Sequence, residues 1–137
     1  MKVFLDTNVI IDYLAVREPF FKDAATIVEL CRKHQLEGML SALTIVNTVY
    51  VLRKAYGKHV MAEKTKWLMN TFTISAIDRK ALQKALDGEP YDFEDAVQEA
   101  SALAVFADVI VTRDKKGFAG FDIPVMTPNE FIARCKE

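Results

Sequence analysis

The sequence predicts a three-layer α/β/α sandwich, in which a central parallel sheet of about five strands has helices on both faces. Short apolar runs rich in β-branched residues alternate with longer stretches whose apolar residues recur at helical spacing. This alternation is typical of parallel strands connected by helices. The 137 residues, of which 51% are hydrophobic, are enough for one core, so we expect a single domain over residues 1–137.

In the first part of the chain, the elements follow from apolar spacing and from the residues that interrupt it. The apolar run over residues 2–5 is typical of a buried parallel strand, and it ends abruptly at Asp6. After this bend, apolar residues beginning at Val9 predict a short helix. Arg17-Glu18-Pro19 ends that helix, and a surface helix with one apolar stripe is expected over residues 20–34.

The middle of the chain is expected to contain a strand, a helical hairpin and another strand. A strand over residues 39–41 follows a turn, and residues 45–56 have helical spacing that Gly57 is able to end. A second helix over residues 59–70 completes the hairpin. Residues 72–77 are rich in β-formers and predict a strand at the edge of the sheet.

The last part of the chain repeats the alternation of helix and strand. Asp78 is placed to cap a helix over residues 79–86, and a strong apolar stripe predicts another helix over residues 93–104. Strands are expected over residues 109–112 and 124–126. A final helix, from Pro128 to Arg134, is opened by the capping-box spacing of Thr127 and Glu130.

Composition limits the kinds of function. The net charge of −1 and the pI near 6.1 argue against a broad basic surface, so any contact with RNA requires a local basic patch. Cys31 and Cys135 have no paired spacing, which argues against a disulfide or a cysteine-rich zinc site. The apolar start lacks a cleavage pattern, and no uninterrupted apolar segment is long enough to span a membrane. We therefore expect a cytoplasmic protein.

The predicted topology brings polar side chains from four segments to the carboxyl edge of the sheet. Asp6 ends the first strand, and Asp114 follows the strand over residues 109–112. Asn47 and Asp95 lie near the starts of helices that begin at the same edge, whereas Asp108 belongs to the opposite edge. Carboxylates without a basic partner repel one another unless a cation or a proton intervenes. The pattern predicts a Mg²⁺ or Mn²⁺ site able to hydrolyse a phosphodiester.

Each of these residues also has an ordinary structural role open to it. Asp6 is placed to cap a helix, Asp95 to interact with a helix dipole, and Asp114 to pair with a neighbouring lysine. Asn47 either holds a metal-bound water or satisfies its own hydrogen bonds against the backbone. Asp12, one turn beyond Asn8, either reaches the same pocket or belongs to a polar helix face.

Charged residues beside the predicted site are open to two interpretations. The basic ones either hold the phosphate backbone of a substrate or are merely solvated. They are Arg113, Lys115 and Lys116 after the strand, and Arg53, Lys54 and Lys58 on the hairpin. The acids Asp92, Glu94 and Glu99 are interpreted as solvated.

Four segments resemble the PIN-domain family, and in particular its VapC-type ribonuclease toxins. They are Leu5-Asp6-Thr7-Asn8-Val9-Ile10-Ile11-Asp12, Ser41-Ala42-Leu43-Thr44, Tyr91-Asp92-Phe93-Glu94-Asp95-Ala96 and Ala107-Asp108-Val109-Ile110-Val111-Thr112-Arg113-Asp114. The resemblance implies a PIN-like fold and an endoribonuclease that depends on Mg²⁺ or Mn²⁺. It also implies the toxin component of a type II toxin–antitoxin pair, often dimeric and often inhibited by its antitoxin.

Residue by residue, the resemblance implies that Asp6, Asp95 and Asp114 bind the metal and that Asn8 and Thr112 support the site. Two positions differ from the usual pattern. Asn47 stands where the family usually has Glu, and Gly117 stands where many members have Asp.

These differences leave two functional hypotheses. In the first, the chain is an active endoribonuclease whose catalytic residues are Asp6, Asn47, Asp95 and Asp114. In the second, it has lost efficient chemistry and binds RNA or a protein. A phosphoacceptor signalling domain fits less well, because Asp6-Thr7-Asn8 lacks the required pair of acids.

Overall fold

The computed structural model describes residues 1–90, 92–118 and 123–137, so Tyr91 of the quoted segments lies outside the described residues. Five parallel strands form one sheet in the order β3-β2-β1-β4-β5. The strands are β1 (Lys2–Leu5), β2 (Glu37–Ser41), β3 (Thr73–Ser75), β4 (Val109–Val111) and β5 (Val125–Met126). The predicted parallel sheet is confirmed, and β3 is one of its edges.

The described residues form six α-helices and one 3₁₀ turn. They are α1 (Thr7–Leu14), α2 (Phe21–Arg32), α3 (Ala42–Thr71), α4 (Arg79–Asp87), α5 (Phe93–Ala104), η1 (Lys115–Gly117) and α6 (Pro128–Cys135). The expected hairpin is α3, which is interrupted at Gly57, whose φ of 77° lies in the left-handed region. It begins earlier than predicted because Ser41 Oγ accepts a hydrogen bond from the Thr44 backbone N–H, at 3.1 Å, and so caps it.

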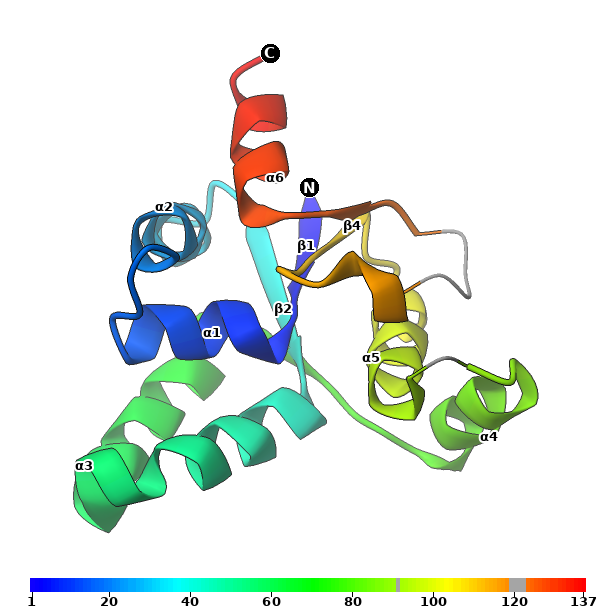
Figure 1. Ribbon diagram of the computed structural model, residues 1–137, viewed down its shortest axis with the longest axis horizontal. Helices are drawn as coiled ribbons and strands as arrows, with labels where there is room; N and C mark the ends of the chain where they lie inside the picture. The colour runs from blue at the N-terminus through cyan, green and yellow to red at the C-terminus, as the bar shows by residue number, and fades with distance from the viewer. Residues whose placement is uncertain (91, 119–122) are drawn as a thin grey trace.

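The alternation of side chains along the strands divides the core between the two faces of the sheet. Val3 and Leu5 belong to a core with α1, α2, α3 and α6, whereas Phe4 and Ile110 pack on the face that α5 covers. Figure 1 shows α1, α2 and α3 on one side of the sheet and α4 and α5 on the other. The predicted three-layer sandwich is therefore confirmed. Within the described part of the chain, no helix is both long and apolar enough to cross a membrane.

The central strand β1 positions the site. It pairs with β2 on one side and with β4 on the other. The chain proceeds from β1 outwards to β2 and β3, and then returns to the other side of β1 for β4 and β5. The strand order thus reverses between β1 and β4, and in parallel sheets the carboxyl ends at such a point form a crevice for ligands. Asp6 and Thr112 directly follow these two strands.

We predict that Gly38→Ala lowers the free energy of unfolding by about 1–3 kcal/mol, because it overfills the core. A Cβ at Gly38 would lie 2.6 Å from Phe72 Cδ1 and 2.8 Å from Cys31 Sγ, and both side chains are buried. Equilibrium urea unfolding measures the change. Gly88→Ala is the matched control, because the atom nearest to the added Cβ would be the Ala85 backbone oxygen, at 3.7 Å, and the φ of Gly88 is −76°. The control should leave stability unchanged or raise it by up to about 1 kcal/mol, and equal destabilisation of both variants would contradict the packing.

Candidate functional site

Asp6 is a buried carboxylate that four hydrogen bonds hold at the end of β1. Its Oδ1 accepts from the Thr7 backbone N–H at 2.7 Å and from Gln98 Nε2 at 3.2 Å. Its Oδ2 accepts from Thr112 Oγ1 at 2.7 Å and from Asn8 Nδ2 at 3.3 Å. Burial and, to a smaller extent, the charge of Asp114 raise the pKa of Asp6, and the hydrogen bonds from Thr112, Thr7 and Gln98 oppose that rise. Asp6 therefore caps α1, as one alternative had it, and also presents a fixed carboxylate at the rim.

Gln98 is a site residue that the sequence analysis missed. It lies on α5, is fully buried, and its Nε2 is 3.2 Å from Thr7 Oγ1 and 2.9 Å from Thr44 Oγ1. Its Oε1 accepts a hydrogen bond from Ser41 Oγ. The signal in the sequence is weak, since it consists only of an amide next to the apolar stripe of this helix. Gln98 links β2 and α3 to the carboxylate at the end of β1.

Asn8 and Thr112 lie between Asp6 and the loop after β4, and their support of the site stays a prediction. Thr112 is fully buried, and its Oγ1 lies 3.3 Å from Asn8 Nδ2. Asn8 Oδ1 accepts from the backbone N–H of Arg113 at 3.3 Å. The backbone N–H of Asp114 donates to Thr112 Oγ1 at 3.2 Å. These contacts fix the loop after β4 to the bend after β1.

Asp95 and Asp114 join Asp6 in one electrostatic environment. Asp95 lies in the first turn of α5 against Gly117, where a Cβ would come within 1.8 Å of its Oδ2. Asp114 is exposed on the loop, and its Oδ1 accepts from the Lys116 backbone N–H at 3.2 Å. Burial, followed by the negative charges of Asp6, Asp92, Glu94 and Asp114, raises the pKa of Asp95 to about 7. The negative charges of Asp6 and Asp114 thus both act on Asp95, the third acid predicted to share this rim.

Asn47 reaches this environment by contacting a glutamate. It lies in the second turn of α3, and its Nδ2 donates to Glu94 Oε1 at 3.0 Å. Burial and the negative charges of Asp92 and Asp6 raise the pKa of Glu94, and the hydrogen bond from Asn47 opposes that rise. Glu94 is exposed, as expected. The expectation that Glu99 is solvated is wrong, because that side chain is buried within α5.

Two of the basic side chains beside the site, Arg113 and Lys115, pair with other acids. Arg113 donates from Nε to Asp12 Oδ2 at 2.6 Å, and its guanidinium lies 3.9 Å from the centre of the Phe20 ring. Asp12 is buried, and its support of the site stays a prediction. Lys115 pairs with Glu130 at 3.0 Å, and Lys116 is exposed. That Arg113, Lys115 and Lys116 bind substrate stays a prediction.

We call Asp6, Asp95 and Asp114 the acid group. It has the chemistry of a cation site without the geometry of a complete one. Across residues 1–90, 92–118 and 123–137, no three His, Cys, Asp or Glu side chains are grouped closely enough to hold a metal ion. Direct binding by Asp6, Asp95 and Asp114 together therefore stays a prediction. None of the ion pairs found in these ranges includes an acid of the group. Mg²⁺ typically uses one or two carboxylates and keeps several waters, which suits such an arrangement.

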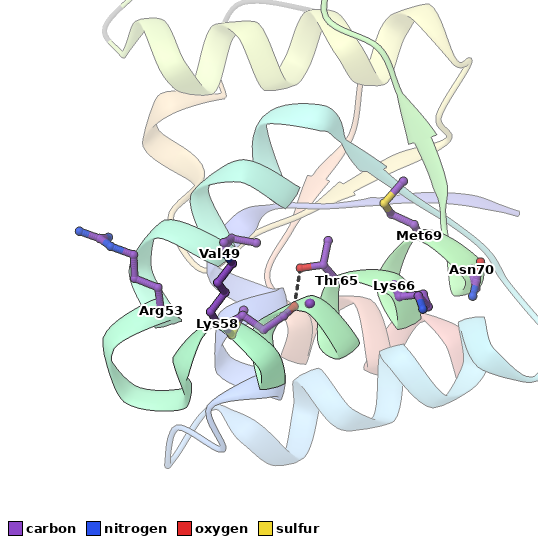
Figure 2. A pocket seen from close by; sticks show the side chains of 9 residues that line it. Val49, Arg53, Lys58, Thr65, Lys66, Met69 and Asn70 are labelled. Carbon is purple, nitrogen blue, oxygen red and sulfur yellow. Dashed lines mark hydrogen bonds between the residues drawn. The ribbon is translucent and has the colours of Figure 1, made fainter.

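A separate groove of about 1010 Å³ lies on α3 and involves none of these acids. Figure 2 shows that side chains from both halves of the helix line it, with Val49 and Arg53 before the kink at Gly57 and Thr65 and Met69 after it. Thr65 Oγ1 donates to the Met61 backbone carbonyl at 2.7 Å, so this hydroxyl is satisfied within its own helix. The groove is largely apolar and is not the predicted acidic site.

Several solved structures resemble this fold over nearly the whole chain. A toxin–antitoxin complex from Klebsiella pneumoniae is 22% identical, with a TM-score of 0.68. The match covers 92% of this chain and 97% of the chain in that complex. VapC20 from Mycobacterium tuberculosis, described as a Sarcin-Ricin loop cleaving toxin, is 13% identical with a TM-score of 0.67, and covers 89% and 98%. VapBC-1 from nontypeable Haemophilus influenzae is 20% identical with a TM-score of 0.68, and covers 94% and 99%.

These identities establish similarity of fold alone, and a comparison with curated proteins finds no match. The family itself is established by sequence. A family model described as the PIN domain matches residues 2–116, which is most of the chain. The chain therefore belongs to the PIN domain family.

Proposed function

We propose that this chain is a metal-dependent endoribonuclease and the toxin component of a type II toxin–antitoxin pair. The observation that carries the proposal is the group of acids at the point where the strand order reverses. Among the described residues, none of the observed ion pairs neutralises these acids. Family membership supports a nuclease. Similar structures include a toxin named for cleaving the Sarcin-Ricin loop and complexes of a toxin with its antitoxin.

In this proposal Asp6, Asp95 and Asp114 would hold Mg²⁺ or Mn²⁺. When bound, the ion supplies positive charge that shields the phosphate oxygens and lowers the pKa of water. The chain contributes by positioning. Four hydrogen bonds fix Asp6, and Gly117 leaves room for Asp95 to approach the loop after β4. Hydrolysis of RNA would consume one water, whose oxygen forms a bond to phosphorus as the bond from phosphorus to the ribose oxygen breaks, and the proton that the water loses would go to the departing ribose oxygen.

The proposed partners are RNA, an antitoxin and a second copy of the chain, in the cytoplasm. The solved toxin–antitoxin complexes support the antitoxin. Large apolar side chains are exposed on α3, α4 and α5. They support self-association, because burying exposed apolar surface against a partner is favourable. They include Tyr50, Leu86 and Phe93.

We predict that the purified protein cleaves RNA in Mn²⁺ or Mg²⁺ and that a chelator stops cleavage. Asp6→Asn should reduce cleavage to background, because it removes a charge from the carboxylate at the centre of the site. Asp108→Asn is the matched control, since Asp108 is an exposed aspartate at the opposite edge of the sheet. Its Oδ2 accepts a hydrogen bond from the Lys2 backbone N–H at 2.7 Å. Gel analysis of a synthetic RNA measures both. Persistent cleavage by Asp6→Asn would refute the assignment, and RNA binding without cleavage at any metal concentration would favour the binding-module hypothesis.

We predict that the metal-free protein loses stability as the pH rises from about 4 to about 7, because Asp95 must then ionise among other acids. A carboxyl whose folded pKa is raised binds more protons in the folded state than in the unfolded state across this window, so stability falls with rising pH. Allowing for solvent screening of this half-buried group, we expect a loss of about 1–2 kcal/mol.

Urea unfolding in a chelator at about pH 5 and about pH 8 measures this loss. Asp95→Asn should show a smaller loss than the wild type, and Mn²⁺ should stabilise the wild type more than the variant at the higher pH. An identical pH dependence of the two proteins would show that Asp95 does not carry the repulsion.

A further inference from the structure

Glu94 and Asn47 form a contact between helices that the proposed function does not use. Asn47 lies in the second turn of α3, and Glu94 lies in the first turn of α5, next to Asp95. The hydrogen bond from Asn47 Nδ2 to Glu94 Oε1, at 3.0 Å, joins residues 47 positions apart in the chain. It is therefore a tertiary contact, which forms only when the chain folds.

The chemistry of this pair is directional. The side-chain N–H of asparagine is a donor that carries no charge, so it favours an ionised carboxylate at Glu94 and adds no repulsion. An acid at position 47 would instead place a carboxylate against a carboxylate. Glu94 directly precedes Asp95 in the first turn of α5, so the bonded carboxylate lies beside an acid of the proposed site.

We propose that Glu94 is a further acid of the cation site and that Asn47 is the residue that positions it. This inference rests on the proposed function. The pair places on α5 the negative charge that position 47 on α3 lacks. Glu94 then adds to the attraction for a divalent cation held beside Asp6 and Asp95, either directly or through water in the ion's shell.

The experiment uses two substitutions that change charge without changing the number of heavy atoms. Glu94→Gln removes the negative charge, and Asn47→Asp adds one on the other side of the same hydrogen bond. In the double variant the new amide on α5 would donate to the new carboxylate on α3, so the charge moves across the bond while the contact remains. Glu63→Gln is the matched control, because Glu63 is an exposed glutamate in the second half of α3.

Calorimetric titration with Mn²⁺ in the absence of RNA is the first readout. We expect Glu94→Gln to weaken Mn²⁺ binding by about 10-fold or more, within the range found when groups that support a metal site are removed. The double variant should recover to within about 3-fold of the wild type, and Glu63→Gln should match the wild type. Wild-type affinity in Glu94→Gln would overturn the role of Glu94, and a double variant as weak as Glu94→Gln would overturn the role of Asn47.

RNA cleavage in Mn²⁺ is the second readout, with Asp6→Asn measured alongside. If Asp6→Asn loses Mn²⁺ binding and cleavage while Glu94→Gln keeps both, this inference fails and the proposed function stands. If wild-type protein neither binds Mn²⁺ nor cleaves RNA, the proposed function itself fails. Circular dichroism of each variant verifies that the fold is retained, since neither residue belongs to a core cluster.

Discussion

The burial of one carboxylate, Asp6, is the constraint on which the site and much of the surrounding fold depend. An ionised carboxylate taken out of water is very costly unless hydrogen bonds replace its solvation. The donors come from the start of α1, from α5 and from the residue after β4, so the charge is tolerated only when these segments meet. Gln98 and Thr112 are themselves fully buried, so their side chains cannot exchange these hydrogen bonds for bonds to solvent. The same contacts that stabilise the charge also make its position rigid.

The acids around Asp6 show the opposite behaviour, because their mutual repulsion is left in place. Arg113 lies beside them in sequence, yet its guanidinium binds the buried Asp12 and stacks on Phe20. Lys115 turns to Glu130 on α6. A chain selected only for stability would use these cations on the acids of the rim. Carboxyls whose pKa values are raised at one point of the fold, while neighbouring cations pair elsewhere, are a mark of a functional site.

The strands and the acids at their ends were predictable from the sequence because both follow from rules of topology and local chemistry. The apolar run that stops at Asp6, the cap at Asp78 and the capping box at Thr127 each act within a few residues of themselves. The contacts of Gln98, Arg113 and Glu94 were not predictable. Each joins positions between 47 and 101 residues apart, and each depends on which rotamer faces which helix. Periodicity specifies a face of a helix and does not specify a partner.

The two departures from the family pattern, Asn47 and Gly117, have a common physical explanation in the first turn of α5. Gly117 has no Cβ, and a Cβ at this position would lie 1.8 Å from the carboxylate of Asp95. Asn47 has no charge, and its amide donates to the carboxylate of Glu94. Each departure thus faces one of two consecutive acids, and an acid at either position would collide with or repel the acid that faces it. The residues of the rim are therefore best understood as contacting pairs between α5 and the segments that face it. In each pair, a carboxylate on α5 faces a small or uncharged residue on the other segment.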